Sequence, residues 1–383
     1  MILKNAVVID EYFKQNRLDI KIENEYIVNI GERLEGEAFD LSGMYIVPGF
    51  IDTHIHGAYG VEMAEAGTTV QQLNAVSKFE ASQGVTCFAP TVRILPLDEM
   101  CAAIERIAFI KQIDGAKIGG IHVEGPFVSE TYKGALLKEY IYKPGVEIIK
   151  RFYEAGGGLV KLLTMAPELE GAEATIQYAA SNGIVVSIGH TNASYEQTEK
   201  AIAWGVSQAT HTFNAMRPLN HRDPGVLGAV LTNENVTCEL ICDFIHLHPA
   251  IVKMVYKLKG DDKINVISDS CAAAGKSDGE YIVGGQKRYV KDGVVRTSDG
   301  TIAGSAKTVY DGVKNLINIG IPIESAIKMA SVNPAKTLGI DAETGSIQVG
   351  KYADLVVLDK EFNVKYTFVN GKVVFSCEGM KKI

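Results

Sequence analysis

Residues 47–56 read Val-Pro-Gly-Phe-Ile-Asp-Thr-His-Ile-His, and this stretch decides how the rest of the chain is interpreted. Its apolar character is typical of a buried strand. His54 and His56 stand two residues apart, and because side chains alternate faces along a strand, both imidazoles point to the same side. Two imidazoles on one rigid strand form half of a metal site. Two unrelated core histidines are the alternative that this pair alone leaves open.

Apolar runs of strand length recur along the middle of the chain. They lie near residues 50–56, 84–89, 117–123, 159–165, 184–190, 208–212, 236–242 and 264–268. Helix-length amphipathic segments separate most of them, such as 70–83, 97–113 and 195–204, the last with a cap cluster at 191–194. Eight strands alternating with helices predict an α/β fold, a parallel (β/α)8 TIM-type barrel over residues 48–342. A doubly wound open sheet is the alternative, but no G-x-G-x-x-G follows the first strand.

The two chain ends are rich in short strands. Strand patterns cover residues 6–9, 18–22 and 26–30 near the N-terminus and 353–358, 364–369 and 372–375 near the C-terminus. Asn370-Gly371 is a strong hairpin turn between the last two. The most economical arrangement pairs both ends, so we expect residues 1–47 and 343–383 to form one small β-sandwich domain.

Composition and charge exclude several functional classes. The chain has 383 residues, of which 46% are hydrophobic and 22% charged, and its net charge is −8. An acidic chain lacks the electrostatic footprint of a protein that binds nucleic acid or an anionic membrane. No apolar run approaches the length of a membrane span. The six scattered cysteines show neither a zinc-finger spacing nor a C-x-x-C pair, which favours a reducing, cytoplasmic compartment.

Residues able to bind a metal fall at the carboxyl ends of the predicted strands. In a barrel these ends converge on one face. Imidazole and carboxylate suit zinc or divalent iron. The sequence therefore predicts one or two divalent ions per subunit, with Glu124, His190 and His211 around one, His54 and His56 on the second, and Glu124 able to bridge them.

Asp269 ends the eighth predicted strand. A divalent metal lowers the pKa of water and makes hydroxide available at neutral pH. Asp269 is then the natural general base, taking the proton of the attacking water and passing it to a leaving amine. A helix cap or a solvated loop aspartate is the structural alternative.

Four motifs carry a resemblance to a known family. They are His54-Ile-His56, His122-Val-Glu124-Gly-Pro-Phe, Gly189-His190-Thr191 and Thr210-His211-Thr-Phe-Asn214-Ala215-Met216. Over essentially its whole length the chain resembles the amidohydrolase superfamily and, within it, the N-acetylglucosamine-6-phosphate deacetylases. The resemblance implies hydrolysis of a phosphorylated amino-sugar substrate, N-acetylglucosamine 6-phosphate, to glucosamine 6-phosphate and acetate. It also implies a homodimer.

The resemblance assigns further residues. Metal binding falls to Glu124, His190 and His211, and proton transfer to Asp269. Arg222 matches a phosphate-binding arginine, which suits the paired donors of a guanidinium. The sugar contacts fall on Ala135, Asn214, Ala215, Asp243, His246, Ile302, Ala303 and Gly304.

One departure from the family pattern affects the substrate. Leu136 stands where the family usually has a histidine thought to polarise the acetyl carbonyl, and leucine donates no hydrogen bond. A second metal at His54 and His56 is one substitute; His122 or His248 reaching into the site is another. A different N-acetyl amino-sugar phosphate, such as the galacto epimer, or a cyclic amide stays open as substrate. A non-catalytic sugar-phosphate binding protein and a purely structural metal site are the alternatives from other classes.

Overall fold

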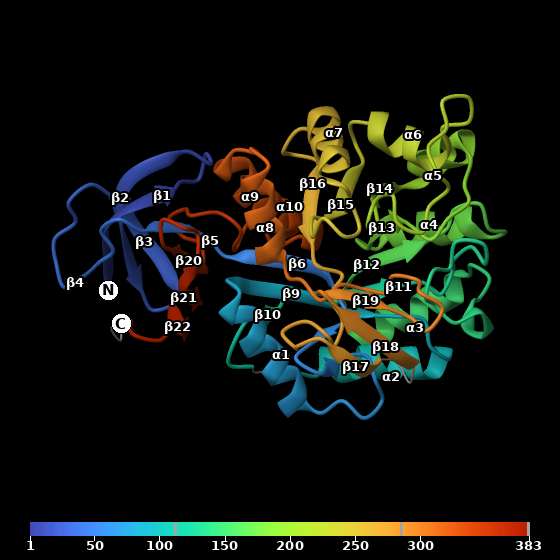
Figure 1. Ribbon diagram of the computed structural model, residues 1–383, viewed down its shortest axis with the longest axis horizontal. Coiled ribbons are helices and arrows are strands. Elements are labelled where there is room, and N and C mark those ends of the chain that lie inside the picture. The colour runs from blue at the N-terminus through green and yellow to red at the C-terminus, as the bar shows by residue number, and fades with distance from the viewer. Residues whose placement is uncertain (111–112, 284–285, 381–383) are drawn as a thin grey trace.

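Eight parallel strands form a nearly closed barrel in the computed structural model, which describes residues 1–110, 113–283 and 286–380 (Figure 1). Neighbouring strands pair in chain order, and a parallel bridge between Ile55 and Ser270 joins the last strand region to the first. This confirms the predicted α/β barrel. The strands are β6 (Phe50–Ile55), β9 (Val85–Val92), β11 (Ile121–Glu124), β12 (Val160–Met165), β13 (Val185–Ile188), β14 (Val206–Ala209), β15 (Thr237–Ile241) and β16 (Ile264–Ile267), with the short β10 (Lys117–Ile118) beside β9.

Helices surround the barrel strands. The predicted cap at 191–194 is present, because the Ser194 hydroxyl accepts a hydrogen bond from the backbone N–H of Gln197, and the Gln197 side-chain oxygen accepts one from the backbone N–H of Ser194. The predicted helix 97–113 is shorter than expected and ends at Ala108 in a turn, while positions 111–112 lie outside the described residues. The helices are α1 (Val70–Ser82), α2 (Leu97–Ala108), α3 (Val146–Gly156), α4 (Ala172–Ser181), α5 (Tyr195–Trp204), α6 (Gly225–Thr232), α7 (Pro249–Lys259), α8 (Val309–Asn318), α9 (Ile323–Met329) and α10 (Val332–Leu338), with a short 3-10 turn at Lys138–Tyr140.

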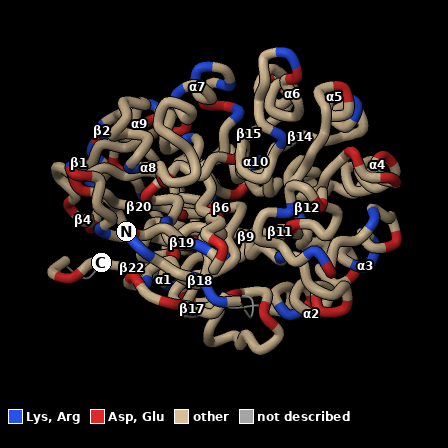
Figure 2. Tube along the Cα trace, turned by 45° about the vertical axis from the view of Figure 1, so that its right-hand side comes forward, with Lys and Arg blue, Asp and Glu red and all other residues tan. Residues whose placement is uncertain are grey.

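Charged residues of both signs lie on the helices and loops at the periphery of the view in Figure 2. Basic and acidic segments alternate along the outer helices, whereas the barrel strands carry few charges (Figure 2). A large buried cluster fills the space between strands and helices, with Phe50, Phe88, Phe127 and Phe152 fully buried in it. Among the described residues no helix is both long and apolar enough to cross a membrane.

Strands from both chain ends form a second sheet, at the left of Figure 1. β5 pairs with β1 on one edge and antiparallel with β20 on the other, and this pairing joins the two ends. Asn370 and Gly371 have φ of 48° and 72°, as a tight hairpin turn requires. The sheet has a cluster of buried hydrophobic residues of its own. The domain boundaries expected at 47/48 and 342/343 remain a prediction. Its strands are β1 (Ile2–Ile9), β2 (Gln15–Glu23), β3 (Tyr26–Gly31), β4 (Ala38–Asp40), β5 (Tyr45–Pro48), β20 (Leu355–Leu358), β21 (Val364–Val369) and β22 (Lys372–Ser376).

A three-stranded antiparallel insert follows β16 and was not anticipated from the sequence. It contains β17 (Gly279–Val283), β18 (Gln286–Lys291) and β19 (Val294–Arg296). Its buried residues pack against Cys271, Ala272 and Ala273, which directly follow the barrel. The insert therefore lies over the carboxyl ends of the strands, beside the short hairpin of β7 (Gly57–Ala58) and β8 (Val61–Glu62).

Candidate metal centre and active-site pocket

Glu124, His190 and His211 meet at the carboxyl ends of the barrel strands. Glu124 is the last residue of β11, and the two histidines follow β13 and β14. Nε2 of each histidine lies 3.2 Å from Oε1 of Glu124, and the two Nε2 atoms lie 3.1 Å apart. All three residues are buried. The structure thus brings together the three residues that the sequence assigns to one ion.

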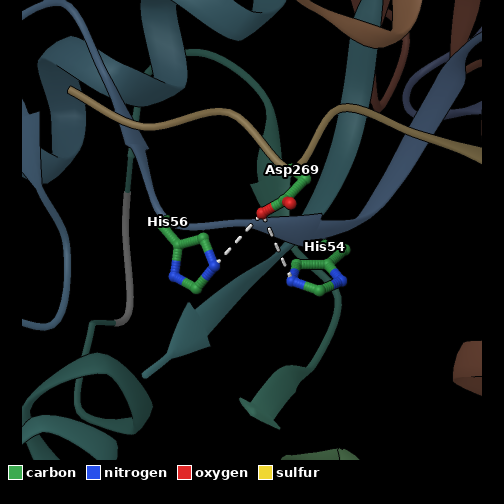
Figure 3. A group of neighbouring side chains, drawn as sticks. All are labelled: His54, His56 and Asp269. Atoms are coloured by element: carbon green, nitrogen blue, oxygen red, sulfur yellow. Dashed lines mark ion pairs between the residues drawn. The ribbon is translucent and has the colours of Figure 1, made fainter. Parts of the chain in front are cut away.

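His54, His56 and Asp269 form a second group beside the first (Figure 3). Oδ1 of Asp269 lies 3.3 Å from Nε2 of His56 and 3.6 Å from Nε2 of His54. Glu124 lies between the groups, because its Oε1 is 3.4 Å from His54 Nε2 and its Oε2 is 3.3 Å from His56 Nε2. The sequence assigned Asp269 only to proton transfer; here it also shares a cluster with the two strand-β6 histidines.

The donor geometry of the first group fits a divalent metal. Tetrahedral bonds of the length that zinc makes to nitrogen and oxygen place neighbouring ligand atoms about 3.3 Å apart. The three separations of 3.1 and 3.2 Å match that edge length. Nδ1 of His190 lies 2.9 Å from the Tyr132 carbonyl oxygen, which can only accept, so in the neutral ring Nε2 carries the lone pair. Buried His54 Nε2 has no hydrogen-bond partner among the described residues, which also suits a ligand atom.

Backbone strain concentrates at the site. His190, His211 and Asp269 have φ of 48°, 28° and 48°, in the left-handed region that non-glycine residues rarely adopt. Each such residue costs about 1–3 kcal/mol and persists where the surrounding structure enforces it. Each of the three follows the end of a barrel strand, and its side chain belongs to one of the two candidate ligand groups. The fold therefore accepts strain to aim these groups.

The charges in this cluster favour protons on its histidines, which a bound metal ion would replace. Burial disfavours charge on His56, but hydrogen bonds to Asp269 and Glu124 outweigh it and raise the pKa of His56 to about 9. Burial likewise works against ionisation of Asp269, yet the adjacent His54 and His56 lower its pKa to about 2. The histidines also hold the pKa of Glu124 well below its usual range against the effect of burial. Because metal ligands must be deprotonated, a metal binding here displaces the histidine protons.

Glu239 is a supporting residue that the sequence reasoning missed. From β15, its Oε2 lies 3.2 Å from Nδ1 of His54, and its Oε1 accepts a hydrogen bond from Gln208. It is fully buried. A carboxylate behind a ligating histidine fixes the tautomer and raises ligand basicity. Its signal in the sequence was a single acid inside the otherwise uncharged strand Thr237–Ile241.

A pocket with a volume of 390 Å3 opens over both groups of ligands. Most of the predicted sugar contacts line it: Ala135, Asn214, Ala215, His246, Ile302, Ala303 and Gly304. Asp243 lies behind this wall instead. Its carboxylate accepts hydrogen bonds from the backbone and ring of His246, the ring contact being 2.8 Å, so it positions that imidazole.

Other residues singled out from the sequence lie elsewhere. Arg222 is exposed and does not line the pocket within the described residues of this one chain. His248 is exposed and caps α7. His122 is buried below the site, 2.8 Å from the Thr164 hydroxyl, and is not part of the pocket wall that the structure describes. Leu136 lines the pocket, whereas neither of these histidines is among the described residues of its wall.

Part of the pocket wall was not anticipated. It comes from β8, the end of β9, the segment after β16 and the three-stranded insert, and includes Glu62, Arg93, Cys271, Gln286 and Arg288. The insert has no helix-strand alternation and contributes residues through tertiary packing, so no local pattern points to them.

Comparisons with known proteins agree with this site. The model of the Amidohydrolase family matches residues 45–374. The N-acetylglucosamine-6-phosphate deacetylase of Lysinibacillus sphaericus is 35% identical over 379 residues, 97% of each chain. The N-acetylgalactosamine-6-phosphate deacetylase of Escherichia coli O157:H7 is 34% identical over 331 residues, 86% of this chain and 87% of that protein.

A solved structure shows the same architecture. It is a mutant N-acetyl-D-glucosamine-6-phosphate deacetylase from Mycobacterium smegmatis in complex with N-acetyl-D-glucosamine-6-phosphate. Its identity to this chain is 31%, its TM-score is 0.91, and the match covers 98% of this chain and 99% of that one. A family match over most of the chain and relatives of this similarity lead to one conclusion: the chain belongs to the amidohydrolase family and is a hydrolase that acts on carbon–nitrogen bonds.

Proposed function

We propose that this chain is a metal-dependent deacetylase that hydrolyses N-acetylglucosamine 6-phosphate to glucosamine 6-phosphate and acetate. The observation that carries the proposal is the position of Asp269. Its carboxylate faces the pocket, in contact with one candidate ligand group and beside the other, where an amide carbonyl and an attacking water would meet. Relatives along nearly the whole chain bear this activity in their names.

The residues that would hold metal are Glu124, His190 and His211 for one ion and His54, His56 and Asp269 for a second, with Glu124 between them. Their nitrogen and carboxylate donors suit zinc or divalent iron. When bound, such a metal supplies Lewis acidity toward the amide carbonyl and lowers the pKa of water.

Asp269 performs the proton transfers in this proposal. Like an ordinary aspartate, it is a carboxylate at neutral pH, so it can accept the proton of the attacking water. The amide C–N bond then breaks, and the same carboxyl group returns the proton to the departing nitrogen. The products are acetate and the free amine. Its 13% side-chain exposure is enough to meet substrate while the pocket limits bulk water.

The sugar would lie against Asn214, Ala215 and His246 on one wall and Ile302–Gly304 on another. Burial opposes a charge on His246, but its hydrogen bond to Asp243 outweighs burial and raises the pKa of His246. Nδ1 of this imidazole faces Asp243, which leaves Nε2 as the nitrogen available to a sugar hydroxyl or a phosphate oxygen. Arg222 is exposed, so it would reach the substrate of a neighbouring subunit in a homodimer rather than its own. We assign the protein to the cytoplasm.

The galacto epimer is the second candidate substrate, favoured by the Escherichia coli relative named for it. The test is acetate release from both N-acetylhexosamine 6-phosphates by protein whose metal content has been measured. Turnover of the gluco compound with the higher kcat/KM supports the proposal, and preference for the galacto compound supports the alternative. Absence of acetate release at full metal occupancy overturns both and favours a binding protein, as Leu136 would allow.

A further inference from the structure

Arg288 is a buried cation that has no carboxylate partner in the part of the chain that the structure describes. The residue is 7% exposed and lines the active-site pocket. Among residues 1–110, 113–283 and 286–380, no carboxylate oxygen lies within 4.0 Å of its guanidinium. Its hydrogen bonds there come from Nη1, at 2.9 Å to Gln286 Oε1 and 3.4 Å to the Lys287 carbonyl. Nε is buried and has no partner in that part of the chain.

The insert places this side chain by simple strand alternation. In β18 the residues Arg288 and Val290 are buried, whereas Lys287, Tyr289 and Lys291 are exposed. Val290 packs in the cluster that seats the insert on the segment after β16. Had the register of β18 been shifted by one residue, every side chain of the strand would have moved to the opposite face of the sheet, and the arginine would have faced solvent. The sequence instead puts the guanidinium on the inner face, over the pocket.

A second cation, Lys133, lines a groove that adjoins the pocket. Pocket residues Gly134–Leu137 and Arg288 also line this groove, which has a volume of 400 Å3. Lys133 donates to the carbonyl oxygens of Gly134 and Leu136 and makes no ion pair within the described residues. Two other lysines of the groove, Lys138 and Lys287, are paired with Glu130 and Glu280. Of the four basic residues that line the groove, Lys133 and Arg288 are the two that form no ion pair with any described residue.

A buried guanidinium that lacks an anion is unfavourable for folding, because desolvation is not repaid. Burial accordingly lowers the pKa of Arg288, an effect that the nearby Cys271 and Glu62 only partly oppose. The neighbouring Arg93 shows the contrast, because its guanidinium is paired with Glu65. An oxyanion would supply the missing partner, because the planar fork of guanidinium donors matches the oxygens of a carboxylate or phosphate.

We propose that Arg288 and Lys133 form an oxyanion-recognition site that selects substrates carrying an anionic group into the groove beside the metal centre. The inference rests on the proposed function for the identity of the reaction. The shared chemistry is an oxyanion attached to the substrate. Two sources fit it, namely the sugar phosphate and a carboxylate on the acyl group.

The test compares Arg288→Met and Arg288→Lys with Arg296→Met, which removes an exposed arginine from the same insert. Three substrates separate the sources: N-acetylglucosamine, its 6-phosphate, and N-succinylglucosamine 6-phosphate. Arg288→Met should lower kcat/KM for the substrate bearing the recognised oxyanion by about 10- to 100-fold, the loss expected for a charge-assisted hydrogen bond. Arg288→Lys should recover part of it, and Arg296→Met should behave as wild type.

Each pattern of results has one meaning. Collapse of the phosphorylated-to-unphosphorylated ratio identifies the phosphate as the ligand, and collapse of the succinyl-to-acetyl ratio alone identifies an acyl carboxylate. Equal loss on all three substrates, or no loss on any, overturns the proposal. A lower thermal midpoint in Arg288→Met, together with equal loss, would mean a structural role. If that variant does not fold, Lys133→Met is measured in its place with the same expectations.

Equilibrium binding keeps the inference separate from the proposed reaction. Inorganic phosphate and succinate are titrated calorimetrically into metal-loaded wild type and Arg288→Met, whose metal content is equal. Weaker binding of either anion to the variant supports the site even if no N-acetylhexosamine phosphate is turned over. Unchanged binding of both anions overturns the oxyanion site, whatever the wild-type enzyme hydrolyses.

Discussion

His190 Nε2 and His211 Nε2 lie 3.1 Å apart, and each also lies 3.2 Å from the same oxygen of Glu124. Two imidazole nitrogens approach this closely when a cation or a shared proton lies between them. The arrangement is therefore built around a positive charge rather than around packing.

Replacing His211 by alanine should remove the ion held by this group. Losing one of three protein ligands leaves an incomplete coordination shell, so we expect metal content to fall by about one equivalent and kcat/KM by at least 100-fold. Metal analysis after gel filtration and an acetate-release assay measure the two effects. His221→Ala, which removes an exposed loop histidine, is the matched control and should retain both. Full metal content in His211→Ala would contradict the assignment.

Asp269→Asn should reduce kcat by about 100- to 10,000-fold, the usual contribution of general acid–base catalysis. The amide keeps the volume of the carboxylate but cannot accept the proton. We expect the ion at Glu124, His190 and His211 to remain, because Asp269 contacts the other group. Single-turnover acetate release together with metal analysis measures this. A variant that retains more than one tenth of the wild-type kcat would show that another group moves the proton.

Glu239→Gln should weaken metal binding at the His54 group selectively. The carboxylate contacts Nδ1 of His54, and loss of such a partner typically costs 10- to 100-fold in metal affinity or activity. The expected result is a metal titration with two steps, of which only one shifts. Glu199→Gln makes the same chemical change at an exposed position of α5 and serves as the control. Equal weakening of both steps would mean that Glu239 stabilises the whole barrel mouth.

Glu80 should make the protein less stable as pH rises. The residue is 1% exposed on α1, and among the described residues its carboxylate oxygens have no hydrogen-bond partner. Burial, followed by the charges of Asp52 and Asp311, raises the pKa of Glu80 well above its usual range. Below the usual carboxyl pKa both folded and unfolded chains hold the proton. Above it only the folded chain does, so the free energy of unfolding falls by about 1.4 kcal/mol per pH unit until the folded-state pKa is reached.

Glu80→Gln removes this dependence. In chelator-treated protein we expect the variant to have a higher thermal midpoint than wild type at pH 8 and an equal one at pH 4. Differential scanning calorimetry at both pH values measures it, with Glu199→Gln as the exposed control. A variant that is less stable than wild type at pH 8 would show that the folded protein carries a stabilising negative charge at this position.

The barrel was predictable because its signals are local. Each of the eight apolar runs indicates one buried strand, and the cap at Ser194 indicates the start of one helix. The turn at Asn370 likewise fixes a hairpin from two residues, since its backbone must adopt positive φ. The insert at 279–296 lacked such a signal. Its strands carry alternating charged residues and are held by packing on the segment after β16, a contact that neighbouring residues do not encode.

The same distinction applies to the pocket. Residues at the ends of barrel strands, such as His190 and His211, could be placed because parallel strands share one carboxyl edge. Glu239 and Arg288 could not, because their roles depend on which side chain faces them across the barrel. Asp243 holds the ring of His246, a contact that only the hydrogen-bond geometry reveals, and its contact with the sugar stays a prediction.

The pairing of β5 with β20 has a consequence for biosynthesis. β5 runs directly into the first barrel strand, yet its partner on one edge is translated only near the end of the chain. While the ribosome is still making the intervening barrel, that edge presents unpaired backbone groups to other nascent chains. Shortening the protein before Leu355 would make this exposure permanent. The C-terminal strands are thus the last part of the chain needed to cover this edge of β5.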